Sequence, residues 1–220
     1  MAETTHENND NKQKILDSAA RLFAAKGYDG VSVREIAEAS EVTKPVIYYY
    51  FKNKEDLYDQ LIKESFAHAA KIHNKIYNSP GNIEDKLRRL MRAHFRFGIE
   101  NPDVIKILYD AIHNQITDHG FGPPTSNAQS AEEDQNFYKV SDFIKVGQTE
   151  EKFRGDADPT KIGMIFVGAI NMFILYQLHS KGDVISDKVA DEVVDVILNG
   201  ILPREEINNQ IKNSQEASDL

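Results

Sequence analysis

Residues 32–57 read SVREIAEASEVTKPVIYYYFKNKEDL. Ser32 is a favoured N-cap residue, and Glu35 three positions later completes the capping-box pattern, which predicts a short helix over about 33–39. Thr43 is placed to cap a second short helix, which tolerates Pro45 in its first turn because the first helical N–H groups have no intrahelical partner. Two short helices joined by a tight turn predict a helix-turn-helix.

The second of these helices has two contrasting faces. At 100° per residue, Ile47 and Phe51 lie within about 40° of each other and form the buried edge with Ile36. The three consecutive tyrosines at 48–50 cover about 200° of the helix, so at least two of them must face solvent or a partner. Tyr49 lies at the centre of this outward side. The alternative is a half-buried surface of an ordinary helical bundle.

Local charge separates this stretch from the rest of the chain. The chain has 26 Lys and Arg against 35 Asp and Glu, a formal net charge of −9 that on its face argues against nucleic-acid binding. Residues 42–54 nevertheless contain three lysines and no acid. Such donors around a small apolar tip suit the phosphates and base edges of a major groove. Lys54 opens the next helix, whose N-terminus also favours a phosphate.

Elsewhere, apolar residues recur at helical spacing. We expect a first helix that ends at Gly27, and later helices over about 54–77, 83–100, 103–117, 131–146, 160–180 and 186–202. Gly, Pro and Ser are dense at 119–127, which predicts a loop. The predicted fold class is all-α with about nine helices, the first three in an N-terminal helix-turn-helix domain. The expected boundaries are a disordered tail (1–11), the helix-turn-helix domain (12–58), a larger helical domain (59–203) and a polar tail (204–220).

Composition excludes several kinds of site. The chain has no Cys, which excludes disulfides, Cys-based zinc sites and thiol nucleophiles. The seven His residues form no i, i+4 pair, and we expect no metal, no cofactor and no catalytic residue. His68 and His73, on different helix faces, are expected to be solvated. The N-terminus carries no signal peptide, and the apolar run 162–176 is shorter than the roughly 18 residues that cross a membrane, so we expect a cytoplasmic protein without membrane contact.

Residues 27–57 resemble the DNA-binding domain of the tetracycline-repressor (TetR) family of transcriptional regulators, above all in the run IYYYFKNKEDL. The resemblance is strong over about residues 12–60. Two departures affect the operator sequence: Glu41 stands where the family usually has Gly in the turn, and Pro45-Val46 replaces a small residue followed by Thr. A left-handed Glu41 would cost about 1 kcal/mol. The resemblance implies phosphate contacts by Ser32, Thr43, Tyr48, Tyr50 and Lys54, and base contacts by Arg34, Lys44, Pro45, Val46 and Tyr49.

Beyond residue 60 the resemblance rests on layout. In the family, the last two helices form a four-helix bundle with a second subunit, which implies a homodimer. The helix expected over 160–180 is apolar on two sides, and such a helix needs two partners, one of them its own core. The alternative is that both sides are intrachain core. The expected interface residues are Ile165, Ala169, Met172, Tyr176, Val189, Val193, Val196 and Ile197.

The family also implies an effector site in the C-terminal domain, which the sequence locates loosely. Each candidate residue has ordinary core packing as its alternative. His94 and Asn171 place polar groups in apolar stripes, where each needs a partner. The candidates predict a mostly apolar or aromatic effector with one or two polar anchors. They are Met91, His94, Phe95, Gly98, Leu108, Ile112, Phe137, Tyr138, Phe143 and Asn171.

The function expected from these observations is a ligand-responsive, sequence-specific DNA-binding transcriptional regulator, a repressor rather than an activator. Its expected partners are a pseudo-palindromic double-stranded DNA operator, a second copy of the chain and a small-molecule effector that releases it from the operator. A bacterial or archaeal cytoplasm is the expected location, with the nucleoid when DNA is bound. The rivals are an all-α small-molecule or lipid-binding protein with no DNA role, and an enzyme that uses His94.

Overall fold

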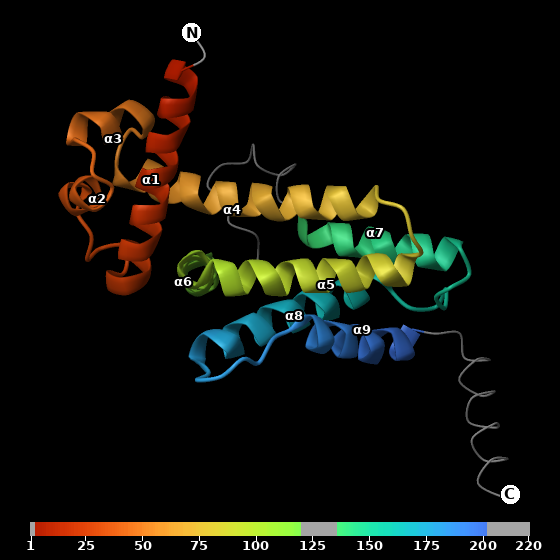
Figure 1. Cartoon of the computed structure of the whole chain (residues 1–220). Helices are drawn as coiled ribbons and strands as arrows, with labels where there is room; N and C mark the ends of the chain where they lie inside the picture. The colour runs from red at the N-terminus through yellow and green to blue at the C-terminus, as the bar shows by residue number, and fades with distance from the viewer. Residues whose placement is uncertain (1–2, 120–135, 202–220) are drawn as a thin grey trace, which may run out of the picture. The chain divides into compact units, whose positions relative to one another are not determined.

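A computed structural model of the chain describes residues 3–119 and 136–201, and every regular element in these ranges is a helix (Figure 1). The all-α prediction is therefore confirmed. The loop expected at 119–127 and the polar tail at 204–220 lie almost wholly outside the described residues. The helices are α1 (Glu3–Lys26), α2 (Val33–Ala39), α3 (Lys44–Tyr50), α4 (Lys54–Tyr77), α5 (Ile83–Glu100), α6 (Pro102–His119), α7 (Asn136–Thr149), α8 (Pro159–His179) and α9 (Asp187–Ile201).

The first helix begins earlier than the sequence suggests. We expect residues 1–11 to be a disordered tail, whereas α1 already starts at Glu3. Residues 3–26 contain neither Gly nor Pro, so the helix can propagate outward from its packed part without a new nucleation step. The apolar stripe from Ile15 onward predicts the part of a helix that is buried, and it carries no information about how far the exposed end continues.

The chain divides into two compact units, which are described separately. The head unit comprises residues 1–68 and 101–130, and the bundle unit comprises residues 69–100 and 131–220. This division differs from the boundary expected at 58/59, because α6 joins the head. Val104 and Ile107 of α6 pack against the head core, and Lys106 Nζ donates a hydrogen bond to the carbonyl oxygen of Ala24 in α1.

The head core combines one apolar face from each of its helices. Ile15 and Phe23 of α1, Ile36 of α2, Ile47 of α3 and Leu57 of α4 are all buried in one cluster. Helices as short as α2 and α3 are marginal by themselves, so this packing supplies most of their stability. The core thereby fixes which side of α3 faces outward.

The bundle unit is built on two close helix contacts, α7 with α8 and α5 with α9. Gly147 near the end of α7 lies against the Phe153 ring, where an added Cβ would approach a ring carbon to 2.2 Å. This close approach requires Gly and lets the α7–α8 connection fold back, with Lys152 N–H bonded to the Gly147 carbonyl oxygen. The buried residues of α5, α8 and α9 form the remaining core: Leu87, Leu90, Met91, Phe95, Phe166, Ile170, Ile174, Ala190, Val194, Leu198 and Ile201.

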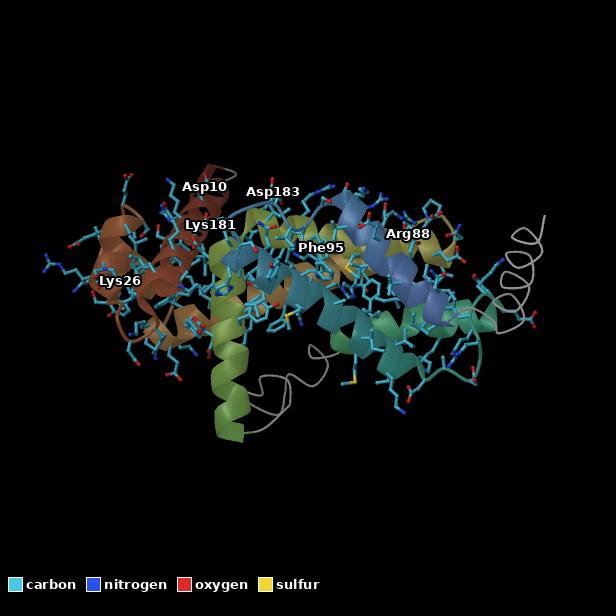
Figure 2. The ribbon with its side chains drawn as sticks, turned by 90° about the horizontal axis from the view of Figure 1, so that it is seen from below. Asp10, Lys26, Arg88, Phe95, Lys181 and Asp183 are labelled. Carbon is cyan, nitrogen blue, oxygen red and sulfur yellow. The ribbon has the colours of Figure 1, made fainter. Side chains whose placement is uncertain are left out.

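A row of ion pairs joins α5 to α9. Three arginines recur every four residues on α5, and three aspartates recur every four residues on α9, so the antiparallel helices bring them together in register. Figure 2 shows Arg88 beside the ribbon of α9. We call this set the Arg–Asp ladder. Its pairs are Arg88–Asp195 (2.5 Å), Arg92–Asp191 and Arg96–Asp187 (3.4 Å).

Helix α8 is apolar along most of its length. By length and composition it could cross a membrane, and no other helix of the described ranges could. The expectation that the apolar run 162–176 is too short to span a membrane rests on that run alone, whereas the helix continues beyond it to Pro159 and His179. One side of α8 packs into the bundle through Phe166, Ile170 and Ile174. Four other apolar side chains of α8 are exposed, and its remaining apolar residues are half-buried. The exposed ones are Met164, Ile165, Met172 and Tyr176.

Candidate nucleic-acid interface

The start of α2 is held by the predicted capping box. Ser32 Oγ accepts a hydrogen bond from Glu35 N–H at 3.2 Å, and a Glu35 carboxylate oxygen accepts one from Ser32 N–H at 2.8 Å. Lys26 Nζ of α1 lies 2.7 Å from the other carboxylate oxygen. The bond from Lys26, followed by those from Ser32, lowers the pKa of Glu35 to about 2. The Ser32 cap is confirmed, and its hydroxyl is already engaged in the head.

The turn between α2 and α3 has an unusual backbone residue. Glu41 has φ +57°, in the left-handed region that favours Gly, as the departure from the family pattern suggests. The turn is closed by a hydrogen bond from Val42 N–H to the Ala37 carbonyl oxygen at 3.0 Å. Thr43 stands at the N-cap of α3 with extended backbone angles, but its hydroxyl makes no capping bond. This exposed hydroxyl therefore stays available to an external acceptor.

The two faces of α3 follow the helical wheel. Ile47 and Phe51 are each 1% exposed, whereas Tyr48 is 53% and Tyr49 is 71% exposed. Tyr50 is half-buried, and its ring contacts that of Tyr49 edge-on at 4.9 Å between centroids. The prediction that at least two tyrosines face outward is confirmed. The alternative, in which the tyrosines form a half-buried surface of a helical bundle, applies only to Tyr50.

Basic residues of the head fall into two groups. Lys44 and Lys52 are exposed, and their ammonium groups form no ion pair with the described residues. Arg34 is also exposed but pairs with Glu38 at 2.7 Å, one turn further along α2. Lys54 is half-buried and donates to two backbone carbonyl oxygens, those of Tyr28 at 2.8 Å and Val31 at 3.0 Å. The head therefore exposes some cations and uses others internally.

All ten residues expected to contact DNA lie in the head unit. The structure brings them to α2, α3, the intervening turn and the first turn of α4. Val46, Tyr50 and Lys54 are half-buried, and the first two pack against the head core. The exposed members are Ser32, Arg34, Thr43, Lys44, Pro45, Tyr48 and Tyr49.

The residues expected to line an effector site are only partly brought together. Leu108 lies in the head unit, apart from the others, which belong to the bundle unit or fall outside the described side chains. Gly98 lies against Ile174, where an added Cβ would approach the side chain to 3.0 Å. The side chains of Ile112, Phe137 and Tyr138 are outside the described part. Met91, Phe95, Gly98 and Phe143 are buried in the bundle, and His94 and Asn171 are half-buried there.

Two histidines on different helices are in contact, which the sequence did not predict. His73 Nε2 of α4 and His94 Nε2 of α5 are 2.8 Å apart, and the rings meet edge-on. The expectation that His73 is solvated is wrong, because it is 4% exposed. The expectation that His94 needs a partner is met by His73. Spacing rules within one helix cannot find this pair, since the two residues lie on different helices.

None of the residues expected at a dimer interface is fully buried in the bundle. Buried positions on α9 are Ala190, Val194, Leu198 and Ile201, which belong to a different stripe. Val196 is 74% exposed, and Ile165, Met172 and Tyr176 of α8 are also exposed large apolar side chains. Ala169, Val189, Val193 and Ile197 are half-buried. The alternative that both stripes are intrachain core does not hold for the exposed members.

Comparison with known proteins identifies the same region. Residues 15–61 match the family model described as bacterial regulatory proteins, tetR family. The chain is also similar to IcaR of Staphylococcus aureus, the biofilm operon icaADBC HTH-type negative transcriptional regulator. The two are 28% identical over 147 residues, which cover 65% of this chain and 76% of IcaR.

Two solved structures show the fold of most of the chain. The fatty acid degradation regulator FadR from Bacillus halodurans aligns with a TM-score of 0.70 at 19% identity, over 85% of this chain and 94% of that one. The regulator FadR from Bacillus subtilis, solved in complex with stearoyl-CoA, aligns with a TM-score of 0.64 at 20% identity, over 86% and 98%. At these identities the likeness establishes architecture.

Proposed function

We propose that this chain, whose residues 15–61 match the tetR family of bacterial transcriptional regulators, is a homodimeric repressor whose operator binding is released by a small effector. The family consists of regulatory proteins, and we propose that this chain acts as a DNA-binding regulator and not as an enzyme. Its proposed site of action is the cytoplasm of a bacterium or archaeon. IcaR is a negative regulator, which supports repression as the sign of control.

The observation that carries the proposal is the division of α3 into a locked face and an exposed face. Ile47 and Phe51 are fully buried, so the helix cannot rotate to hide Tyr48 and Tyr49. Two neighbouring tyrosines exposed on one face of a short helix favour contact with a partner, because Tyr is enriched at interfaces, where its ring packs and its hydroxyl donates. A DNA groove meets this requirement, because phenol hydroxyls and the neighbouring Lys44 ammonium can donate to phosphates and base edges.

The proposed contacts fall into two classes. Groups on the flanks hold phosphates and fix the register, whereas groups at the tip read base edges and thymine methyls. To contact DNA, Arg34 would have to leave its exposed partner Glu38. The free-energy cost is small, because such surface pairs contribute about 0–1 kcal/mol to stability. The proposed phosphate contacts are Ser32, Thr43, Tyr48 and Tyr50, and the proposed base contacts are Arg34, Lys44, Pro45, Val46 and Tyr49.

A homodimer would cover the exposed apolar side chains of α8 and the exposed Val196 of α9. A two-fold dimer presents two recognition helices to successive major grooves, about 34–36 Å apart, and therefore reads a pseudo-palindrome. The Met172→Glu/Val196→Glu double variant should sediment as a monomer at micromolar concentration, because it places charge in the buried interface. Lys181→Glu, an exposed charge change outside both stripes, should remain dimeric. A wild-type chain that sediments as a monomer would contradict the dimer.

The effector is proposed to bind in the bundle unit. Met91, Phe95 and Phe143, which are buried there, would supply apolar contacts, and the half-buried His94 and Asn171 would supply polar groups. One structural neighbour was solved with stearoyl-CoA, a molecule with a long apolar chain and a polar end. The effector would release DNA by binding more tightly to a conformation that does not fit the operator, since a ligand shifts an equilibrium only through differential affinity.

Selection of bound fragments from the source genome, followed by mobility shift, tests DNA recognition. The wild type should retain specific fragments, and its affinity should fall steeply as salt rises. Tyr49→Ala should reduce discrimination between operator and random DNA, and Tyr49→Phe, which keeps the ring, shows how much depends on the hydroxyl. Retention of no specific fragment would favour the rival, a helical binding protein with no DNA role.

A further inference from the structure

The ammonium group of Lys54 is surrounded by acceptors from its own chain. Nζ donates to the carbonyl oxygens of Tyr28 and Val31 at 2.8 and 3.0 Å. It also lies 4.1 Å from the centroid of the Tyr28 ring, within the range of a cation–π contact. A lysine ammonium has three N–H donors, so these contacts take up most of its bonding capacity.

These acceptors belong to the segment that joins α1 to α2. The segment begins at Gly27, which has φ +72°, and ends at the Ser32 cap of α2. Within it, Val31 is buried in the head core. The Tyr28 ring also packs against Tyr58 of α4 at 5.1 Å between centroids. The segment is therefore attached to α4 at two places one turn apart, Lys54 and Tyr58.

We propose that Lys54 is a positioning residue that fastens the α1–α2 segment to the first turn of α4, and not a phosphate contact. The inference rests on the proposed function, in which the head binds operator DNA. By donating to the Tyr28 and Val31 carbonyl groups, Lys54 fixes the point at which α2 begins. This in turn fixes the position of α3. This role replaces the phosphate contact that position 54 has by resemblance to the family.

To reach a phosphate, the Lys54 ammonium group would have to leave its contacts with Tyr28 and Val31. Two charge-assisted hydrogen bonds and a ring contact would be lost, and hydrogen bonds to an ionised donor are roughly twice as strong as neutral ones. Lys44 and Lys52 would lose no such contacts, because their ammonium groups are exposed and form no ion pair in the described ranges. Lys52 is therefore the lysine of this region that is available to neutralise a phosphate, and Lys44 is available for its proposed base contact.

The two roles predict different responses to salt. A lysine that neutralises a phosphate releases a counterion, and its removal lowers the slope of log affinity against log salt by about 1. A lysine that only holds the head together lowers the melting temperature and leaves this slope unchanged. We therefore compare Lys54→Met with Lys44→Met and Lys52→Met in the full chain, because Met keeps most of the apolar stem and removes the donors.

The expected result is a lower melting temperature with an unchanged salt slope for Lys54→Met. Lys52→Met should show the reverse, an unchanged melting temperature and a slope reduced by about 1. A slope reduced by about 1 in Lys54→Met, whatever its melting temperature, would overturn the proposal. An unchanged melting temperature in Lys54→Met would overturn it as well.

A measurement on the wild type covers the case in which Lys54→Met does not fold. In nitrogen-edited NMR of lysine ammonium groups, the Lys54 signal should persist in the DNA-free protein and stay unshifted when operator is added. The Lys44 signal should appear or shift with operator. A Lys54 signal that is visible only with DNA would contradict the proposal. If the wild type retains no specific DNA, the proposed function fails, whereas the DNA-free signal and melting temperatures still decide the role of Lys54.

Discussion

The head and bundle units hold their helices together by different means. The head seats α3 through full burial of Ile47 and Phe51, and the charged groups beside them stay at the surface. The bundle joins α5 to α9 through apolar contacts and the Arg–Asp ladder, in which each of the three arginines has an aspartate partner. The difference shows that the position of a cation, rather than its number, decides whether it is available to a ligand.

This contrast explains how an acidic chain can bind DNA. Residues 1–60 contain eight basic and eleven acidic residues, so the head is itself acidic. The lysines at 44 and 52 are nevertheless exposed near the recognition helix, and the ladder arginines are occupied by aspartates. The remaining negative charge should suppress non-specific binding and leave recognition to a few placed contacts.

The largest expected effect concerns the seat of α3. Ile47→Ala removes a fully buried side chain and should destabilise the protein by about 2–5 kcal/mol. Operator binding should fall with it, because α3 loses the contact that fixes its orientation. Thermal and urea unfolding measure the loss, with Tyr48→Ala on the exposed face as the matched control at about 0.5 kcal/mol or less. Equal losses in the two variants would mean that burial does not seat α3.

The ladder should contribute less than the buried anchor of α3. Arg92 and Asp191 are both partly exposed, and pairs of this kind contribute up to about 1 kcal/mol. Arg92→Asp alone should destabilise the protein, and the swapped pair Arg92→Asp/Asp191→Arg should recover much of the loss. A double-mutant cycle in urea gives the coupling energy, which should shrink as salt rises. Additive single effects would show that the ladder does not couple α5 to α9.

The two units also offer a matched pair of strained residues. Glu41 in the head and Glu151 in the bundle have φ values of +57° and +59°. Glu41→Gly and Glu151→Gly should each stabilise the protein by up to about 1 kcal/mol, less the greater entropy of Gly in the unfolded chain. Only Glu41→Gly should also raise affinity for non-specific DNA, because it removes an acid beside the recognition helix. A similar rise with Glu151→Gly would indicate a general charge effect.

The smallest effect is expected at the α2 capping box. Folding lowers the pKa of Glu35 to about 2, chiefly through Lys26 and then Ser32, so its ionised form is stabilised in the folded state. The sign follows: its contribution is present above the ordinary pKa of about 4.5 and is lost as pH falls towards 2. The difference in melting temperature between wild type and Glu35→Gln should therefore be largest near neutral pH. A constant difference down to pH 3 would contradict this origin.

Much of the recognition region follows from local rules. The Ser32–Glu35 cap joins residues three positions apart, and the two faces of α3 follow from the fixed rotation of a helix per residue. Both predictions are confirmed because the interactions that decide them are short-range. The limit of this reasoning appears at Thr43, which stands at the N-cap position but makes no capping bond, and at α1, where the apolar pattern does not mark the exposed end.

The all-α class, the helix-turn-helix and the outward face of α3 could therefore be predicted from the order of the residues. Tertiary packing was needed to show that α6 belongs to the head, that His73 contacts His94 and that the α5 arginines pair with the α9 aspartates. It also decided that the Lys54 ammonium lies against the carbonyl groups of Tyr28 and Val31. The fourfold spacing of the ladder charges is visible in the sequence, but nothing local pairs one helix with the other. The physical reason is that helical periodicity reports which side of a helix is buried, whereas the identity of its partner depends on how distant segments pack.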